Sequence, residues 1–335
     1  MKHLVAILVF AALSPTFAQR QSHETHEGWV FNPQDYEVPL AYRQELEANL
    51  LWMIARERRI AGREKVEPVV GVYADSGVWH LGARSIVFAL EREGIPVRVL
   101  DHAAMGQGDF KGLKAIIVPG GYAFHMKDGV GEAGMAAIRR LVSSGGTYLG
   151  VCAGGFFAAK TVRWEGESFP YPLGLFDGTA EGSLPNIAVW PKSAGVRLTL
   201  ADKRPEFQLL DDEPIYYQGG CRFVGGTEVN VIATYPDKSA AIIERKVGSG
   251  RIVLSGGHIE RLAPTFDSNA SKPPPKFAGR SYAKLMRLEA KPGAVSLQPW
   301  NAREFRSSFN AETKLDTMLA REAALRVKLS SLKKK

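Results

Sequence analysis

The 335-residue sequence predicts an α/β fold of the doubly wound kind, in which helices flank a mostly parallel sheet. Three observations support this prediction. Short apolar runs typical of buried strands alternate with helical stretches, and glycine and proline mark the boundaries between them. Hydrophobic residues make up 45% of the chain, which is enough for a real core and excludes a disordered protein. We also expect a helical extension on each side of the domain.

The first 66 residues precede the predicted domain. Residues 1–18 combine a cationic start, an apolar stretch and a proline, a pattern typical of a secretory signal peptide cut after Ala18. The apolar stretch is too short to span a membrane, which needs about 20 residues. We therefore expect an exported protein with no membrane contact after cleavage. Residues 19–66 contain an amphipathic helix over 41–63, whose apolar face should pack against the domain.

Residues 67–262 form the predicted α/β domain. The expected elements, in chain order, are strand 68–74, helix 82–93, strands 96–100 and 114–118, helix 131–143, strand 147–151, and strands 230–235, 240–246 and 251–254. Between them, residues 162–212 are rich in glycine, proline and aromatic residues. This segment is either an elaboration over the site or a β layer on one edge of the sheet.

Past residue 262 the composition changes. Residues 263–309 include a run of three prolines and are predicted to be a linker or a long surface loop. Residues 310–335 are predicted to form a charged helix that docks on its own domain or on a second copy of the chain. The sequence does not predict the oligomeric state.

Cys152 is the most informative residue. It ends the apolar run 147–151 and is followed at once by Ala153, Gly154 and Gly155. A strand that ends in a nucleophile and turns directly into a helix is a nucleophile elbow, and its tight backbone requires small neighbours. The N-terminus of the following helix favours thiolate over thiol. The alternative is a buried structural cysteine at a strand end.

Two further segments could supply the groups that a cysteine nucleophile needs, a base with its orienting carboxylate and an oxyanion hole. The apolar run 250–255 leads into His258-Ile-Glu260, and residues two apart on an extended chain face the same way. His258 could therefore act as base and Glu260 as the group that orients it, although a surface ion pair would also explain the two. Pro119-Gly120-Gly121 follows another strand, and its backbone amides could form an oxyanion hole with Ala153.

These segments together resemble a known family. Residues 118–121, 150–155, 216–220 and 255–260 are similar to the flavodoxin-like fold of class I glutamine amidotransferases, and more closely to the biotin-protein ligase N-terminal-like domain. The resemblance implies Cys152 as nucleophile, His258 as base and Glu260 as orienter. It places Gly120, Gly121 and Ala153 around the oxyanion. It does not imply ligase activity, because the roughly seventy residues past residue 262 are too few for a biotin ligase catalytic domain.

One residue departs from the family pattern. Glutamine-hydrolysing members carry a glutamine four residues after the cysteine, whereas this chain has Phe156. Glutamine is therefore a doubtful substrate. We expect the substrate pocket to be aromatic and glycine-rich; its predicted residues are Tyr122, Phe156, Phe157, Tyr217, Gly219 and Gly220.

The remaining composition limits the partners. The net charge of +8 is modest, and much of it comes from the C-terminal end, so we expect no nucleic-acid partner. Neither a phosphate-binding loop nor a metal-ligand spacing occurs, and we expect no cofactor and no metal. The second cysteine, Cys221, could form a disulfide with Cys152, but we favour separate roles because a disulfide would consume the nucleophile.

The prediction for function follows from these residues. We expect an exported cysteine-dependent hydrolase of the amidase type, acting through Cys152, His258 and Glu260 on an amide or related acyl group of a small molecule or peptide-like substrate. The alternative is a non-catalytic binding module that keeps the fold and uses the pocket for a ligand or partner.

Overall fold

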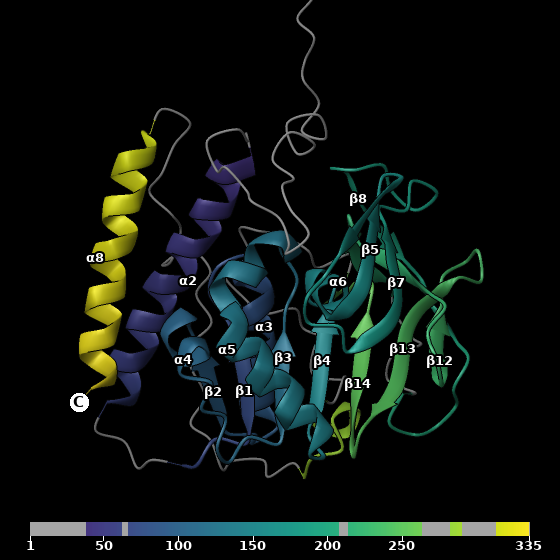
Figure 1. The fold of residues 1–335 in the computed structure, drawn as a ribbon, viewed down its shortest axis with the longest axis horizontal. Helices are drawn as coiled ribbons and strands as arrows, with labels where there is room; N and C mark the ends of the chain where they lie inside the picture. The colour runs from purple at the N-terminus through teal and green to yellow at the C-terminus, as the bar shows by residue number, and fades with distance from the viewer. Residues whose placement is uncertain (1–37, 62–65, 208–213, 263–281, 290–312, 335) are drawn as a thin grey trace, which may run out of the picture.

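The structure is a computed structural model and describes residues 38–61, 66–207, 214–262, 282–289 and 313–334 (Figure 1). The predicted signal peptide, residues 1–18, and most of the predicted linker, residues 263–309, lie outside these ranges. Among the described helices, none has both the length and the apolar character needed to cross a membrane.

The centre of the sheet is parallel, with the strand order β2–β1–β3–β4–β14. The strands are β1 (Val70–Tyr73), β2 (Val97–Leu100), β3 (Ala115–Val118), β4 (Thr147–Val151) and β14 (Gly250–Ser255). They are almost wholly buried, as expected for a sheet covered on both faces, which explains their continuous apolar sequences. The predicted strands 68–74, 96–100, 114–118 and 147–151 are all confirmed.

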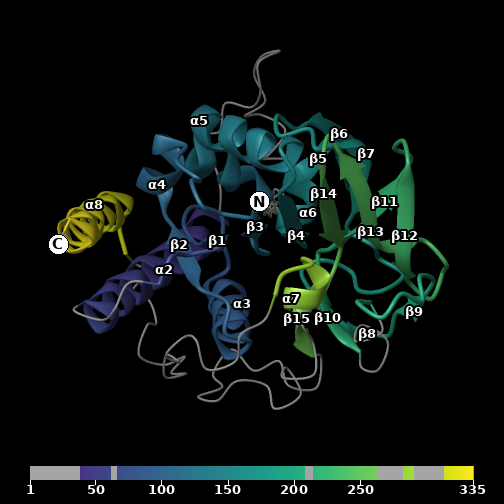
Figure 2. The ribbon, with the colours of Figure 1, turned by 90° about the horizontal axis from the view of Figure 1, so that it is seen from below.

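Helices cover both faces of this parallel unit. They are α3 (His80–Arg92), α4 (His102–Gln107), α5 (Ala123–Ser143) and the short α6 (Ala153–Ala158). Figure 2 shows α4 and α5 on one face and α3 on the other, so the unit is doubly wound. The predicted helix over 131–143 matches the part of α5 after a kink at Gly131, whose φ of 63° is not helical, and the part of α5 before the kink was not predicted.

The other half of the sheet is mostly antiparallel, with β5 and β7 paired in parallel. Its strands are β5 (Ala159–Trp164), β6 (Glu167–Pro170), β7 (Phe176–Gly182), β9 (Thr199–Leu200), β11 (Cys221–Val224), β12 (Val229–Thr234) and β13 (Ala240–Val247). β13 pairs with β14 and so joins the two halves. The β5–β7 segment therefore extends one edge of the sheet, the second of the two alternatives for residues 162–212. A separate small sheet contains β8 (Ser193–Val196), β10 (Ile215–Gln218) and β15 (His258–Leu262).

The two helical extensions pack on the domain and on each other. Figures 1 and 2 both show α2 (Val38–Ile60) beside α8 (Leu315–Lys333). Leu46 and Leu50 of α2 are buried, and so are Met318 and Leu329 of α8. Of the two predicted modes for the C-terminal helix, the structure shows docking on its own chain.

The described part of the predicted linker is not a linker. Residues 282–285 form the short helix α7 (Tyr282–Leu285), whose first two amides donate to the Glu93 carboxylate at 2.8 and 3.0 Å. Leu285 and Met286 are buried. The domain therefore extends beyond the predicted boundary at residue 262, because apolar residues after the proline run pack back onto α3.

Candidate active site

Cys152 sits at a sharp turn between β4 and α6. Its backbone has φ 51° and ψ −107°, a strained conformation for a residue with a side chain. Its amide donates to the Ser255 carbonyl at 2.7 Å, which fixes the turn against the end of β14. A Cβ on Gly154 would overlap the Val118 carbonyl, so a small residue is required after the cysteine. Only 4% of Cys152 is exposed.

His258 and Glu260 lie side by side on β15. The His258 Nδ1 is 2.7 Å from the Glu260 Oε1, and both side chains are buried. The expected same-side arrangement of the two residues is thus present, but they begin β15 rather than end β14. The chain leaves β14 at Ser255, turns through two glycines and pairs with β10, where His258 lies opposite Tyr216.

The charges around His258 favour its protonated form. Burial lowers the pKa of His258, but the negative charge of Cys152 and of Glu260, with a hydrogen bond to each, raises that pKa to about 10. Glu260 occupies Nδ1, which leaves Nε2 for Cys152. The other oxygen of Glu260, Oε2, is buried and has no hydrogen-bond partner among the described residues. The site therefore places the His258 imidazole, with its raised pKa, between Cys152 and the Glu260 carboxyl group.

The loop after β3 packs directly against Cys152 and His258. A Cβ on Gly120 would overlap the His258 Cε1 and would lie 3.3 Å from the Cys152 Cβ. Within the described part of the chain, the amides of Gly120, Gly121 and Ala153 donate to no acceptor. Free amides beside a nucleophile are the groups that stabilise a developing oxyanion.

Two aromatic rings lie beside His258: Trp79, which the sequence analysis did not single out, and Tyr216, which it quoted only as part of the motif 216–220. Trp79 meets the imidazole edge-on, with the ring centroids 5.2 Å apart, and the Tyr216 ring centroid is 5.5 Å away. Trp79 follows β1 and therefore stands at the carboxyl edge of the sheet, which was the available signal. The Gln218 carbonyl, 4.0 Å from the Cys152 Sγ, was also missed.

The predicted pocket residues have different fates. Phe156 lies one helical turn after Cys152, and its ring meets Trp164 edge-on at 5.8 Å between centroids. Tyr122 is half-buried on the loop after β3. Phe157 and Tyr217, which were predicted to line the pocket, are both 0% exposed and belong to the core.

Tyr217 has a structural role. Its hydroxyl accepts a hydrogen bond from the Leu184 amide and donates one to the Gly220 carbonyl, so it braces the segment beside Cys152. Gly219 has a positive φ of 57°, and a Cβ there would lie 2.6 Å from the Trp190 ring. Gly220 has no room for a Cβ against the Gly256 carbonyl. These two glycines therefore allow their backbone to pack closely against the Trp190 ring and the Gly256 carbonyl.

The two cysteines are free thiols. Cys221 is fully buried on β11, and burial raises the pKa of its thiol well above the ordinary range. The structure therefore has the separate roles favoured from the sequence: a buried Cys221 that stays protonated and a Cys152 beside a cationic ring.

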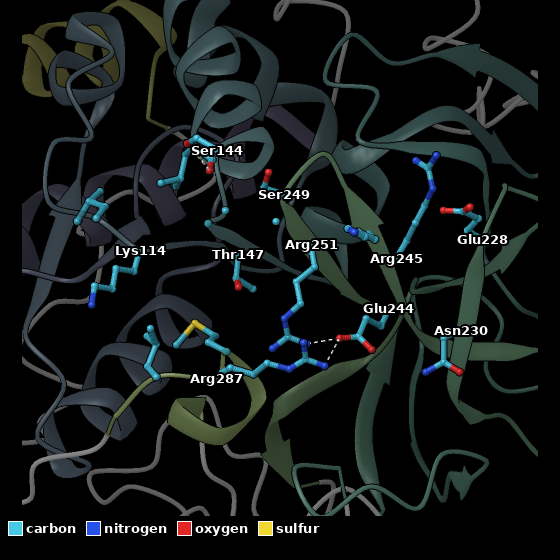
Figure 3. A pocket seen from close by; sticks show the side chains of 18 residues that line it. Lys114, Ser144, Thr147, Glu228, Asn230, Glu244, Arg245, Ser249, Arg251 and Arg287 are labelled. Carbon is cyan, nitrogen blue, oxygen red and sulfur yellow. Dashed lines mark hydrogen bonds and ion pairs between the residues drawn. The ribbon is translucent and has the colours of Figure 1, made fainter.

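A cavity of about 650 Å³ lies away from this site (Figure 3). Its lining comes from the amino ends of β3, β4 and β14, whereas Cys152 follows the carboxyl end of β4. The arginines drawn there are engaged: Arg251 and Arg287 both pair with Glu244. The candidate chemistry rests on the residues around Cys152, because this cavity contains no nucleophile paired with a base.

Several known proteins share sequence or fold with this chain. Residues 72–291 match the family described as "Biotin-protein ligase, N terminal". An uncharacterized protein of Chlamydia muridarum is 31% identical over 222 residues, which are 59% of this chain and 82% of that protein. A biotin–protein ligase of Schizosaccharomyces pombe is 29% identical over 194 residues, 52% of this chain but only 31% of the ligase. A crystal structure of a glutamine amidotransferase aligns with 57% of this chain and 90% of its own, with 24% identity and a TM-score of 0.43.

Proposed function

This chain belongs to the biotin-protein ligase N-terminal family, and from that premise we propose that it is a cysteine-dependent hydrolase of an amide or a related acyl group. One observation carries the proposal: a strained cysteine stands beside an imidazole that a buried carboxylate orients. Covalent acyl transfer requires this combination of nucleophile, base and orienting group. Ligase activity is not part of the proposal, because the chain aligns with only 31% of the ligase relative.

In the proposed mechanism the Cys152 thiolate attacks the carbonyl carbon and the carbonyl oxygen takes the negative charge. The amides of Gly121 and Ala153 donate to that oxyanion. His258 then gives its Nε2 proton to the leaving amine, and the C–N bond breaks to leave a thioester on Cys152. Water attacks the thioester while His258 accepts its proton, the acid leaves, and the thiolate–imidazolium pair is restored.

The surroundings of Cys152 support an apolar acyl group rather than glutamine. Phe156 occupies the position where glutamine-hydrolysing relatives carry glutamine. The Phe156 ring packs edge-on against Trp164, and Trp164 packs edge-on against Trp190, with the ring centroids 5.8 Å apart in each pair. Gly219 lies beneath the Trp190 ring and directly follows Gln218, whose carbonyl is 4.0 Å from the Cys152 Sγ. Such surfaces favour the burial of aromatic or aliphatic groups.

The test uses probes that need no knowledge of the natural substrate. p-Nitrophenyl acetate reports acylation of the thiol, and a panel of primary amides that includes glutamine and phenylacetamide reports complete turnover. We expect wild-type protein to release p-nitrophenolate and to prefer phenylacetamide to glutamine. Cys152→Ala should be inactive, and His258→Ala should be slower by on the order of a thousandfold or more.

Iodoacetamide labelling followed by peptide mapping supplies the internal control. The label should appear on Cys152 and not on the buried Cys221. If Cys152→Ala processed the probes as fast as wild type, the hydrolase proposal would be wrong. A wild-type thiol that is neither acylated nor alkylated would favour the non-catalytic binding module instead.

A further inference from the structure

We infer that the helices α2 and α8 hold the loop of residues 75–80 against the loop after β3, which contains the candidate oxyanion-hole amides. Both helices lie outside the family-matched residues 72–291. By this inference, Arg326 of α8 is a positioning residue for the site. The first part concerns the fold alone. The second part, the effect on catalysis, rests on the proposed function.

The loop of residues 75–80 is paired with the backbone of the candidate oxyanion hole. The Trp79 amide donates to the Gly120 carbonyl at 2.8 Å, and the Tyr122 amide donates to the Gly77 carbonyl at 2.6 Å. These two bonds flank Gly121 and leave its amide free. The direction of the Gly121 amide therefore depends on where the loop of residues 75–80 lies.

Arg326 fixes the start of this loop. Its Nη1 and Nη2 donate to the two oxygens of Asp75 at 2.9 and 2.8 Å, and Asp75 is 0% exposed. The same carboxylate accepts from the amides of Ser76, at 2.7 Å, and His102, at 2.9 Å. Burial raises the pKa of Asp75, but Arg326 and these two amides lower that pKa by more, so the net shift is downward. Without Arg326 a charged carboxylate would remain buried and short of a partner, which strongly destabilises its surroundings.

Helix α2 fixes the end of the loop. The side-chain amide of the buried Asn49 donates to the Val78 carbonyl at 2.8 Å. Glu45 accepts from the His80 amide at 2.8 Å and lies 2.6 Å from the His80 Nδ1. The two residues that flank Trp79 are therefore both held by α2.

The two helices are also fastened to each other. Arg43 of α2 pairs with Glu322 of α8 at 2.8 Å, and Arg321 of α8 pairs with Glu47 of α2 at 2.6 Å. Glu322 in turn pairs with Arg326 at 2.9 Å. Both ends of the described chain thus converge on one loop, and a shift of that loop would reach His258 through its edge-on contact with Trp79.

The experiment compares Arg326→Ala with Lys333→Ala. Lys333 is a matched control on the same helix: it is similarly exposed, and it pairs with Asp101 at 2.8 Å without touching the loop. Amide hydrogen exchange of peptides that contain Trp79 and Tyr122 measures whether the loop is held. We expect exchange to be about tenfold faster or more in Arg326→Ala and unchanged in Lys333→Ala.

Two reagents separate positioning from general destabilisation. Alkylation of Cys152 by iodoacetamide develops no oxyanion, whereas acylation by p-nitrophenyl acetate does. We expect Arg326→Ala to slow acylation by about tenfold or more while alkylation changes much less, since single oxyanion donors are worth on the order of a hundredfold. Arg326→Lys keeps the charge but not the two-pronged contact and should recover part of the acylation rate.

Asn49→Ala provides a second arm that leaves no buried charge. It should change exchange and acylation in the same direction as Arg326→Ala. Equal loop exchange in wild type, Arg326→Ala and Asn49→Ala would overturn the inference. If wild type is not acylated but loop exchange still rises in both variants, the hydrolase proposal fails and the support of the loop by α2 and α8 stands.

Discussion

His258 and His125 have similar burial but opposite charge states. The interactions of His258 with Cys152 and Glu260 outweigh the effect of burial and raise the pKa of His258 to about 10. His125 stacks on Tyr42 with ring centroids 3.8 Å apart, and burial together with the nearby Arg43 lowers its pKa to about 3. Burial disfavours a charged ring unless an opposite charge lies beside it, and Glu260 supplies that charge to His258.

A histidine-selective NMR titration tests this contrast in one sample. The protonated fraction of His258 should stay high through neutral pH and fall only as the pH rises through about 10, while His125 should remain neutral above about pH 3. Glu260→Gln removes one of the groups that raise the pKa, so His258 should lose its proton at a lower pH in that variant. If His258 titrated near 6.5 in both proteins, the effect assigned to Cys152 and Glu260 on the pKa of His258 would be wrong.

At the scale of elements, the loops after β3 and β4 bring the groups of the candidate site together. Pro119-Gly120 directly follows strand β3 and Cys152 directly follows β4, so two neighbouring parallel strands bring an amide-bearing loop and a thiol to the same edge of the sheet. Gly120, on the loop after β3, has no space for a methyl group, because a Cβ there would overlap the His258 ring on β15 and crowd the Cys152 Cβ. The lack of a side chain at residue 120 is therefore a condition for the close approach of the imidazole.

Gly120→Ala should displace His258 and slow the reaction of Cys152 with p-nitrophenyl acetate, by on the order of a hundredfold if the ring moves by about 1 Å. Gly106→Ala is the matched control, because a Cβ there meets nothing within 4 Å and Gly106 lies in helix α4. That control should react like wild type and be stabilised by up to about 1 kcal/mol. Equal acylation rates in the two variants would contradict the packing described for Gly120.

At the scale of the whole molecule, segments from both ends of the chain complete the domain. The Arg326–Asp75 contact joins residues 251 positions apart, and Arg43–Glu322 joins residues 279 apart. Helix α8 is mostly polar and exposed, but Met318 and Leu329 are buried at 4% and 2% exposure. A few apolar anchors and a set of ion pairs therefore attach this helix to the rest of the protein.

Leu329→Ala should lower the free energy of unfolding by about 2–5 kcal/mol, with the smaller value if the neighbouring side chains close the cavity. Leu319→Ala on the same helix should change it by less than about 0.5 kcal/mol, because Leu319 is 42% exposed. Urea unfolding followed by circular dichroism measures both. Two variants of equal stability would mean that α8 does not dock in solution as the structure has it.

Much of the fold was predictable from local sequence. The parallel strands, the helix after β1 and the turn at Cys152 were expected within a few residues of where the structure has them, because buried strands and tight turns leave local signatures. The start of α5 was missed because Gly131 interrupts its pattern. The change of direction between β14 and β15 was missed because an extended run with two glycines reads as one strand.

The sequence by itself determined the α/β class, the elbow at Cys152 and the same-side placement of His258 and Glu260, since each depends on a short stretch of backbone and on residue size. Only the tertiary structure decided that Trp79 packs on His258, that Phe157 and Tyr217 are core residues, and that Arg326 binds Asp75. These contacts join residues far apart in the chain. Burial and charge pairing depend on which surfaces meet after folding, and no local pattern records that choice.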